Sequence, residues 1–362
     1  MSAPRVLVSG VLLGQPAGGV RRHCAELLPR AANLLGSSGG ALAMMEGSVP
    51  VAFGLPSSVE RLRSSVPPRP VLVRATLEGR WLRKVLEAAK TPFDLVHLAH
   101  LPVPRHLPVP YSLTLHDLRD LELAHTPMSR RMVARKVIGR AVEHAACVIT
   151  VSETVREDLL ERFELDAERV LVVPNAGDHL PVLAREAGPD APILHVGHVE
   201  RRKNIELLLR ALAVDADLPP LLAAGAPKEG EDERLAGLAR KLGVAERVNL
   251  VGAVDDAELA RLYARAACVA LPSLLEGFGI AALEAGRAGV PLCVSSAGAL
   301  SEVAGPSTPT FAPDDPAACA LAIRAALATS EEALRETRAR AERWRWDDSA
   351  ARLVRAWTEA AA

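Results

Sequence analysis

Short apolar segments alternate with amphipathic helical segments along almost the whole chain. In the first half, the apolar segments predict strands at residues 6–9, 71–73, 95–97, 112–115 and 148–151. Helices are predicted to begin at about Gly19, Gly79, Ser129 and Glu153. Alternation of this kind is typical of a sheet of parallel strands covered by helices.

The second half repeats the pattern after a segment rich in turn residues. Strands are predicted at residues 193–196, 221–224, 248–250, 268–271 and 292–294, with helices at 204–214, 232–242 and 256–265. Residues 175–191, with Gly and Pro at several positions, are interpreted as a linker. A chain of 362 residues also exceeds what one core usually supports.

These patterns predict an α/β protein of two Rossmann-like, doubly wound domains with a ligand in the cleft between them. The expected domains are residues 1–180 and 181–345, and the chain beyond Pro316 is expected to be helical. Residues 346–362 form an amphipathic C-terminal helix, which we expect to pack back on the first domain.

The composition narrows the class of protein. No apolar run reaches the length of a membrane span, and the N-terminus lacks the apolar region of a signal peptide. The five cysteines are scattered without paired spacing, which favours reduced thiols in a cytoplasmic protein over a disulfide or zinc framework. The mildly basic first half is a weak indication of an anionic partner, and the lack of a basic run with aromatics argues against nucleic acid.

The most informative local pattern lies between Glu276 and Glu284. A predicted strand at 268–271 precedes it, and a helix is predicted over 281–288, so Glu276 falls in the loop and Glu284 in the helix. Gly277 and Gly279 flank Phe278 and aim backbone N–H groups at a ligand near the helix N-terminus. Anion-binding amides beside two carboxylates suit a nucleotide sugar. The alternative is an ordinary Glu-Gly loop followed by a surface charge.

Two features of the first half are candidates for ligand contacts. Gly18 and Gly19 follow the first strand at a helix N-terminus, where they could cradle a phosphate, although a plain turn is also consistent with them. His116 ends a predicted strand, where it could act as a general acid or base or simply be structural. His97 and His100 are poorly spaced to form a metal site with it.

A basic segment follows the first strand of the second half. His198, Arg201, Arg202 and Lys203 precede a predicted helix, and cations placed there can neutralise a diphosphate. The alternative is a solvated basic loop. The Asp215-Ala216-Asp217 pattern falls at a helix end, so we interpret it as a surface turn and expect no required Mg²⁺.

Taken together, these motifs resemble retaining glycosyltransferases of the GT-B fold, of the "glycosyl transferases group 1" type in glycosyltransferase family 4. The resemblance covers nearly the whole chain. It rests on the Gly18-Gly19 loop, the segment around His116, residues 148–153, Val173-Pro174-Asn175, residues 197–204 and the block from Glu276 to Glu284.

The resemblance implies transfer of a hexose from GDP-mannose or a UDP-hexose to a glycan, a lipid-linked sugar or a small molecule, without a metal or other cofactor. It implies that Glu284 binds the ribose and Glu276 the transferred sugar, that Lys203 neutralises the diphosphate, and that His116 lies near the reacting carbon. Further donor contacts are implied for Gly18, Gly19, His198, Arg202, Val254, Gly277, Phe278, Gly279 and Ile280. Polysaccharide biosynthesis in the cytoplasm is the implied setting.

Two departures from the family pattern leave alternatives open. Many relatives have Arg where this chain has His198, so the diphosphate loses a permanent charge unless Arg202 moves toward it. The usual Asn-Gly pair is replaced by Asn175-Ala176-Gly177. His198 leaves a catalytically inactive nucleotide-sugar-binding module as an alternative. Another GT-B enzyme, such as a nucleotide-sugar epimerase, is a separate alternative.

The helix expected from Ser129 carries a group of basic residues. In related enzymes that act on lipid-linked acceptors, a basic first domain docks on the anionic inner face of the membrane. Here the basic residues spread over more than one helix face, which favours a solvated helix over membrane docking. They are Arg130, Arg131, Arg135, Lys136 and Arg140.

Overall fold

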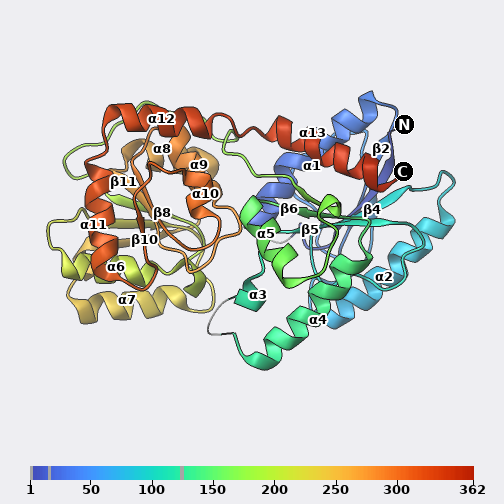
Figure 1. Ribbon diagram of the computed structural model, residues 1–362, viewed down its shortest axis with the longest axis horizontal. Coiled ribbons are helices and arrows are strands. Elements are labelled where there is room, and N and C mark those ends of the chain that lie inside the picture. Colours follow the sequence, from blue (N-terminus) through green and yellow to red (C-terminus); the bar gives the residue numbers. More distant parts are fainter. Residues whose placement is uncertain (1–2, 15–17, 123–125) are drawn as a thin grey trace. The chain divides into compact units, whose positions relative to one another are not determined.

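The computed structural model describes residues 3–14, 18–122 and 126–362 (Figure 1). The chain divides into two compact units. Unit 1 comprises the chain up to Pro174 together with Trp346–Ala362, and unit 2 comprises Asn175–Arg345. The division thus falls a few residues before the boundary at 180 that the turn-rich segment suggested.

Unit 1 is built around a parallel sheet of seven strands in its described residues, in the order β3-β2-β1-β4-β5-β6-β7. The strand order reverses between β1 and β4, which are hydrogen-bonded neighbours. The strands are β1 (Arg5–Gly10), β2 (Ala41–Glu46), β3 (Glu60–Arg63), β4 (Leu95–Leu98), β5 (Tyr111–Leu115), β6 (Cys147–Thr150) and β7 (Val170–Val172). The helices are α1 (Gly19–Ser37), α2 (Val71–Ala88), α3 (Arg119–Glu122), α4 (Met128–His144) and α5 (Glu153–Arg162).

Unit 2 contains a second parallel sheet, with the order β10-β9-β8-β11-β12-β13. This is the doubly wound order 3-2-1-4-5-6 of dinucleotide-binding folds, with its reversal between β8 and β11. The strands are β8 (Ile193–Val196), β9 (Leu221–Ala224), β10 (Val248–Gly252), β11 (Cys268–Leu271), β12 (Leu292–Ser295) and β13 (Thr310–Phe311). The helices are α6 (Ile205–Val214), α7 (Glu231–Leu242), α8 (Asp256–Arg265), α9 (Ile280–Arg287), α10 (Leu300–Ala304), α11 (Pro316–Leu327) and α12 (Glu331–Ala341). The expected α/β class with two doubly wound sheets is confirmed.

Local sequence explains where several helices of unit 2 begin and end. The Asp255 side chain accepts a hydrogen bond from the Glu258 amide and so caps α8. Asp315 caps α11 in the same way, and Pro316 occupies the first helical position, where no amide donor is needed. Gly243 ends α7 with a φ of 71°, a left-handed conformation that glycine adopts without steric cost.

The sequence interpretation was wrong for one apolar segment of unit 1. Residues 71–73 open helix α2 instead of forming a strand, and Leu72 is 80% exposed. A three-residue apolar run carries too little periodicity to distinguish the two. Strands β2 and β3 were not predicted, because Ala, Met, Glu and Arg have low β-propensity. Pairing overrides this preference, since β2 pairs with β1 and β3 pairs with β2.

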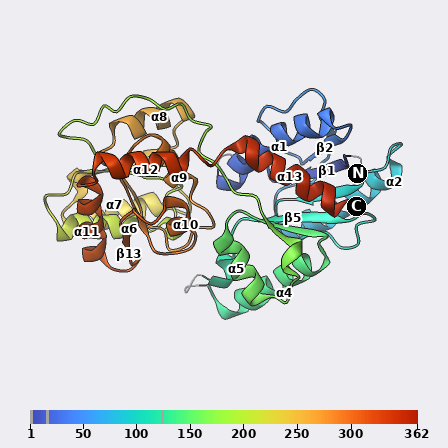
Figure 2. The same ribbon diagram turned by 45° about the horizontal axis from the view of Figure 1, so that its top comes forward.

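The last helix, α13 (Trp346–Ala360), belongs to unit 1 and lies along α1 (Figures 1 and 2). Trp346 and Trp357 are its anchors, and both are fully buried. The Trp357 ring meets His97 of β4 edge-on, with centroids 5.1 Å apart. The chain therefore returns to unit 1 after completing unit 2. None of the helices in the described ranges is both long and apolar enough to cross a bilayer.

We predict that Trp357→Ala destabilises the protein by about 3–5 kcal/mol, because the substitution removes a fully buried aromatic side chain and leaves a cavity. Urea denaturation followed by circular dichroism measures the change. Arg355→Ala, at an exposed position of the same helix, is the control and should change stability by less than about 0.5 kcal/mol. Equal effects of the two substitutions would contradict the anchoring role of Trp357.

Candidate functional site

The candidate site of unit 2 begins at the loop after β8. Gly197 directly follows the strand and has a φ of 145°, a conformation that favours glycine. A Cβ atom at this position would lie 3.2 Å from the Lys203 side chain, which crosses the glycine. The absence of a side chain at Gly197 thus allows Lys203 to lie against the backbone at the point where the strand order reverses.

Hydrogen bonds join this loop to the loop after β11. The Leu274 amide donates to the Arg202 carbonyl at 2.8 Å. The Asn204 side-chain amide donates to the carbonyls of Pro272 at 3.0 Å and Pro313 at 2.7 Å. Asn204 itself has a left-handed φ of 54° and lies directly before α6. The two loops therefore lie at the switch point, which is the place between β8 and β11 where the strand order reverses. They are held together independently of any ligand.

An ion cluster occupies this junction. Glu276 accepts hydrogen bonds from Lys203 on one carboxylate oxygen and from Arg202 Nη1, at 2.9 Å, on the other. Arg202 also pairs with Glu200 at 2.9 Å and donates to the Leu275 carbonyl at 2.8 Å. Burial opposes ionisation of Glu276, but Lys203 and Arg202 outweigh it and lower its pKa to about 2. Glu276 is therefore an ionised hydrogen-bond acceptor at neutral pH.

The turn after Glu276 leads into α9. Phe278 is buried and packs edge-on against Trp344, with centroids 5.4 Å apart. Gly279 caps the helix with a φ of 96°, and Ile280 is the first helical residue. From the other side, the Ala299 amide donates to the Glu276 carbonyl at 2.9 Å. The turn is thus fixed with the N-terminus of α9 directly behind it, an arrangement that favours an anion.

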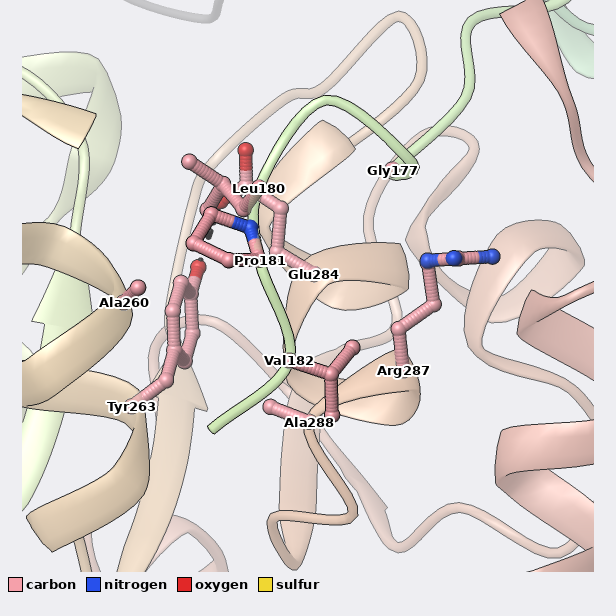
Figure 3. Close-up of a pocket in the computed structure, with 9 residues that line it drawn as sticks. All are labelled: Gly177, Leu180, Pro181, Val182, Ala260, Tyr263, Glu284, Arg287 and Ala288. Atoms are coloured by element: carbon pink, nitrogen blue, oxygen red, sulfur yellow. Dashed lines mark hydrogen bonds between the residues drawn. The ribbon is translucent and has the colours of Figure 1, made fainter. Parts of the chain in front are cut away.

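Glu284 lies on α9 and is only 7% exposed (Figure 3). The Tyr263 hydroxyl donates to one carboxylate oxygen at 2.6 Å, and His179 Nε2 lies 3.0 Å from the other. Burial, followed by the Glu284 charge, raises the pKa of Tyr263 well above its usual value, so Tyr263 remains a donor. The adjacent cavity of about 10 Å³ has room for about one water molecule and is not itself a ligand pocket.

Sequence reasoning missed both partners of Glu284. Tyr263 comes from the end of α8, and His179 comes from the segment interpreted as a linker. Neither residue belongs to a recognisable motif, and only the folded chain brings them to α9. The one available signal was that Tyr263 is one of two tyrosines in the chain, and that signal is weak.

Two further residues predicted for the donor, His198 and Val254, lie in the same unit. His198 is half-buried, and burial, followed by the Lys228 charge, lowers its pKa, so it is neutral at neutral pH. Val254 is half-buried in the loop between β10 and α8. Arg201 is 73% exposed, with Glu231 at 3.7 Å, and takes no part in the ion cluster. The expected movement of Arg202 toward a diphosphate would have to break its three contacts described above.

In unit 1, Gly18 and Gly19 lie at the start of α1. Gly18 is the N-cap residue with a φ of 145°, and its carbonyl accepts a hydrogen bond from the Arg22 amide at 2.9 Å. Gly19 is exposed, and a Cβ atom there would meet nothing within 4 Å. The conformation thus requires glycine at position 18 only. Residues 15–17 of the expected phosphate loop lie outside the described residues.

His116 directly follows β5, and its ring meets the buried His23 ring edge-on at 4.8 Å. Burial, followed by the charge of His23, lowers the pKa of His116 well below its usual value. His97 lies within β4, where its Nδ1 is 2.9 Å from the Ser112 hydroxyl, and burial lowers its pKa to about 3. A neutral His116 can donate or accept a hydrogen bond, but it is a poor proton donor at neutral pH.

The acidic pair of the Asp215-Ala216-Asp217 pattern contacts Arg324 of α11. Within the described ranges, no group of three or more His, Cys, Asp or Glu residues is arranged to hold a metal ion. The pattern therefore forms a surface ion pair in this structure.

Two family models match the chain. The model for Glycosyl transferases group 1 matches residues 184–344, and the model for Glycosyltransferase Family 4 matches residues 17–179. The first match falls in unit 2, the second covers most of unit 1 and the beginning of unit 2, and together they span nearly the whole sequence. The chain therefore belongs to the group 1 glycosyltransferases.

Individual relatives support this assignment. An MMP alpha-(1->4)-mannosyltransferase of Mycolicibacterium hassiacum is 31% identical over 232 residues, which cover 61% of this chain and 53% of the relative. The chain spans about half the length of the first curated relatives it matches.

Solved structures define the fold as GT-B. Sucrose-phosphate synthase from Thermosynechococcus elongatus superposes with a TM-score of 0.79 at 24% identity, over 98% of both chains. The Anabaena HepE protein, solved in complex with UDP and glucose, superposes with a TM-score of 0.72 at 16% identity, over 97% of this chain and 98% of its own.

We predict that acid lowers the stability of the protein, because the imidazoles of His97 and His195 are buried. In the unfolded chain, histidines titrate near pH 6.5, whereas the folded-state pKa of His97 is about 3 and that of His195 about 4. Between these values the unfolded chain binds more protons, so stability should fall as the pH drops below about 6.5. Urea denaturation midpoints between about pH 7.5 and 4.5 measure this trend.

A matched variant isolates the contribution of one imidazole. His97→Asn cannot titrate in this range, so its midpoint should fall less steeply with decreasing pH than that of the unmodified protein. Parallel pH profiles for the two proteins would show that His97 does not contribute to the acid sensitivity.

Proposed function

We propose that this chain is a retaining glycosyltransferase that moves a hexose from a nucleoside-diphosphate sugar to an acceptor hydroxyl. The observation that carries the proposal is the ion cluster of Lys203, Arg202 and Glu276 at the switch point of unit 2. It lies beside a glycine-rich turn at the N-terminus of α9. Ligands of doubly wound sheets bind at this edge, and the cluster offers both a cation and a sugar-hydroxyl acceptor there.

The geometry suggests how the groups divide the work. Lys203 and the N-terminus of α9 would stabilise the negative charge that grows on the leaving diphosphate. Ionised Glu276 would accept hydrogen bonds from hydroxyls of the transferred sugar. Glu284 would accept from the ribose, because each carboxylate oxygen has a second lone pair beyond those used by Tyr263 and His179. The departing phosphate oxygen would take the acceptor proton.

We also propose that transfer needs no metal ion or other cofactor. The support is that Lys203 contacts Glu276 directly before the amide-bearing turn, so that the cation and the amides together would neutralise a diphosphate without a divalent cation. His198 would contribute a hydrogen bond but no charge, because its pKa is lowered.

For the donor we propose GDP-mannose or a UDP-hexose, and for the acceptor a glycan, a lipid-linked sugar or a small molecule, within polysaccharide biosynthesis in the cytoplasm. The support for a hexose donor is that one relative is a mannosyltransferase and that a protein of the same fold was solved in complex with UDP and glucose. The competing function is an inactive nucleotide-sugar-binding module, favoured by His198 alone. It predicts nucleotide binding without turnover.

A weak association of unit 1 with an anionic membrane surface is a further part of the proposal. Met128 and Met132 of α4 are 69% and 67% exposed, and with Arg135 they lie on one helix face at spacings of four and three residues. Exposed apolar side chains beside a cation suit the interface of an anionic bilayer.

The experiment that tests the proposed function first is a thermal-shift screen with UDP, GDP, ADP, dTDP and NAD, with and without Mg²⁺. A ligand at about a hundred times its Kd adds about 2.7 kcal/mol of stability. We expect stabilisation by UDP or GDP that does not depend on Mg²⁺. A response to NAD alone, or to no diphosphate, would contradict the proposal, and a response only with Mg²⁺ would contradict metal independence.

The two carboxylates should have separable effects. We expect Glu276→Ala to abolish transfer while leaving nucleoside-diphosphate affinity nearly unchanged, because Glu276 would contact the sugar. Glu284→Gln should weaken nucleotide binding by about 1.5–3 kcal/mol, because a charged acceptor to the ribose is lost. Calorimetric titration with the diphosphate found in the screen measures both.

Tyr263→Phe is the matched control for Glu284. It removes one hydrogen bond to the carboxylate but keeps the charge, so its effect on nucleotide affinity should be smaller than that of Glu284→Gln. Equal losses of nucleotide affinity for Glu276→Ala and Glu284→Gln would contradict the division of roles.

A further inference from the structure

The connection between β4 and β5 in unit 1 contains no helix. Residues 99–110 include Pro102, Pro104, Pro108 and Pro110, and proline at such spacing prevents a helix by removing amide donors. In a doubly wound sheet a helix commonly covers such a connection. Here an extended segment takes its place on the face of the sheet that α2 and α4 cover (Figure 1).

This segment is anchored and forms the floor of a groove. Arg74 of α2 donates to the Leu101 carbonyl at 2.5 Å. A Cβ atom at Gly79 of α2 would lie 3.1 Å from Pro104, so glycine there lets the segment approach the helix. Val103, Leu107 and Val109 of the segment pack against the core of unit 1. The floor is therefore part of the folded unit.

The groove lies between α2 and α4, with a volume of about 1130 Å³. It is lined from Leu72 to Arg83 along α2 and from Val133 to His144 along α4. At 1.5 Å per residue each wall is roughly 16 Å long, or about three helical turns. Its volume lies above the usual range of about 300–1,000 Å³ for small-molecule pockets.

All charged side chains that line the groove are basic. No Asp or Glu is among its lining residues. The cations along its walls and floor are exposed, and within the described ranges no ion pair neutralises them. They are Arg80, Arg83, Arg105, Lys136 and Arg140. Between them lie apolar side chains, including Leu72 and Val133, which are 80% and 63% exposed.

We propose that this groove binds an acidic amphipathic α-helix of a partner protein. The groove lies over a connection that lacks a covering helix, its walls are about three turns long, and apolar side chains lie between its cations, which together match the helix-in-groove mode of recognition. The unpaired cations on both walls select acidic residues on the flanks of that helix. A flat bilayer would not reach a floor recessed between two helices. The proposal is independent of the transferase activity.

The test uses the full chain and a labelled synthetic peptide of about 14 residues, which forms about four helical turns. Leucines at positions i, i+3, i+4 and i+7 form its apolar face, and glutamates flank them. One control peptide replaces glutamate by lysine, and another has the same composition in scrambled order. In fluorescence anisotropy, we expect the acidic amphipathic peptide to bind at least about tenfold more tightly than either control.

Substitutions at exposed positions locate the binding site without disturbing the core. Lys136→Glu with Arg140→Glu, and separately Leu72→Ser with Val133→Ser, should each weaken peptide binding about tenfold or more. Arg240→Glu with Lys241→Glu, exposed cations of α7 in unit 2, is the matched control and should leave binding unchanged. Thermal denaturation verifies that each variant is folded.

Three results would overturn the proposal. One is equal binding of the scrambled and amphipathic peptides, which would indicate unspecific attraction. Another is peptide binding that is absent or insensitive to the groove substitutions. In the third, the peptide does not bind, but the protein binds phosphatidylglycerol vesicles and not phosphatidylcholine vesicles. If the groove substitutions abolish this vesicle binding, the groove is assigned to a membrane surface.

Discussion

A buried carboxylate stays ionised only where cations or hydrogen-bond donors compensate its negative charge. This constraint determines how the loops are arranged at the switch point of unit 2. Glu276 satisfies it with Lys203 and Arg202, which come from the loop after the neighbouring strand β8. The two loops must therefore lie close together. Gly197 leaves room for Lys203, and a Cβ atom at Gly298 would lie 2.3 Å from the Glu276 carbonyl oxygen. Glycine at these two positions therefore allows the close approach of the loops at this site.

Other buried carboxylates of the chain meet the same constraint with different partners. Glu284 is held by a hydroxyl and an imidazole. Glu78 of α2, in unit 1, accepts from the Ser9 hydroxyl at 2.6 Å and lies 3.0 Å from His100. Burial raises the pKa of Glu78, but His100 and Ser9 lower it by more than burial raises it. The net pKa is lowered, so Glu78 remains ionised. Glu46 and Glu231 are likewise paired with two cations each, Glu46 with Arg61 and Arg63 and Glu231 with Arg234 and Arg201. Glu276 differs in its place, because its two cations lie at the point where the strand order of unit 2 reverses and where ligands of doubly wound sheets bind.

The sequence predicted those parts of the fold in which local pattern and tertiary packing agree. The strands β8, β9 and β11 were predicted at their observed bounds, because continuous apolar runs mark strands buried on both faces. Strand β3 is charged and exposed, so only its pairing with β2 identifies it. The Glu276 loop was predictable from its glycines. The contacts of Glu284 with Tyr263 and His179 were not, because they join segments that no local motif links.

The contacts of Arg202 and Lys203 also refine the roles expected for these two cations. Arg202 is bound to Glu276, to Glu200 and to the Leu275 carbonyl, and Glu200 in turn lies 3.4 Å from Lys228. Moving Arg202 toward a diphosphate would break these three contacts. Lys203 contacts one carboxylate oxygen within the described ranges and crosses the unsubstituted Gly197. Its flexible stem can turn toward an added anion while Arg202 still orients Glu276. Because neutral His198 supplies no charge, Lys203 is the cation that we propose neutralises a leaving diphosphate.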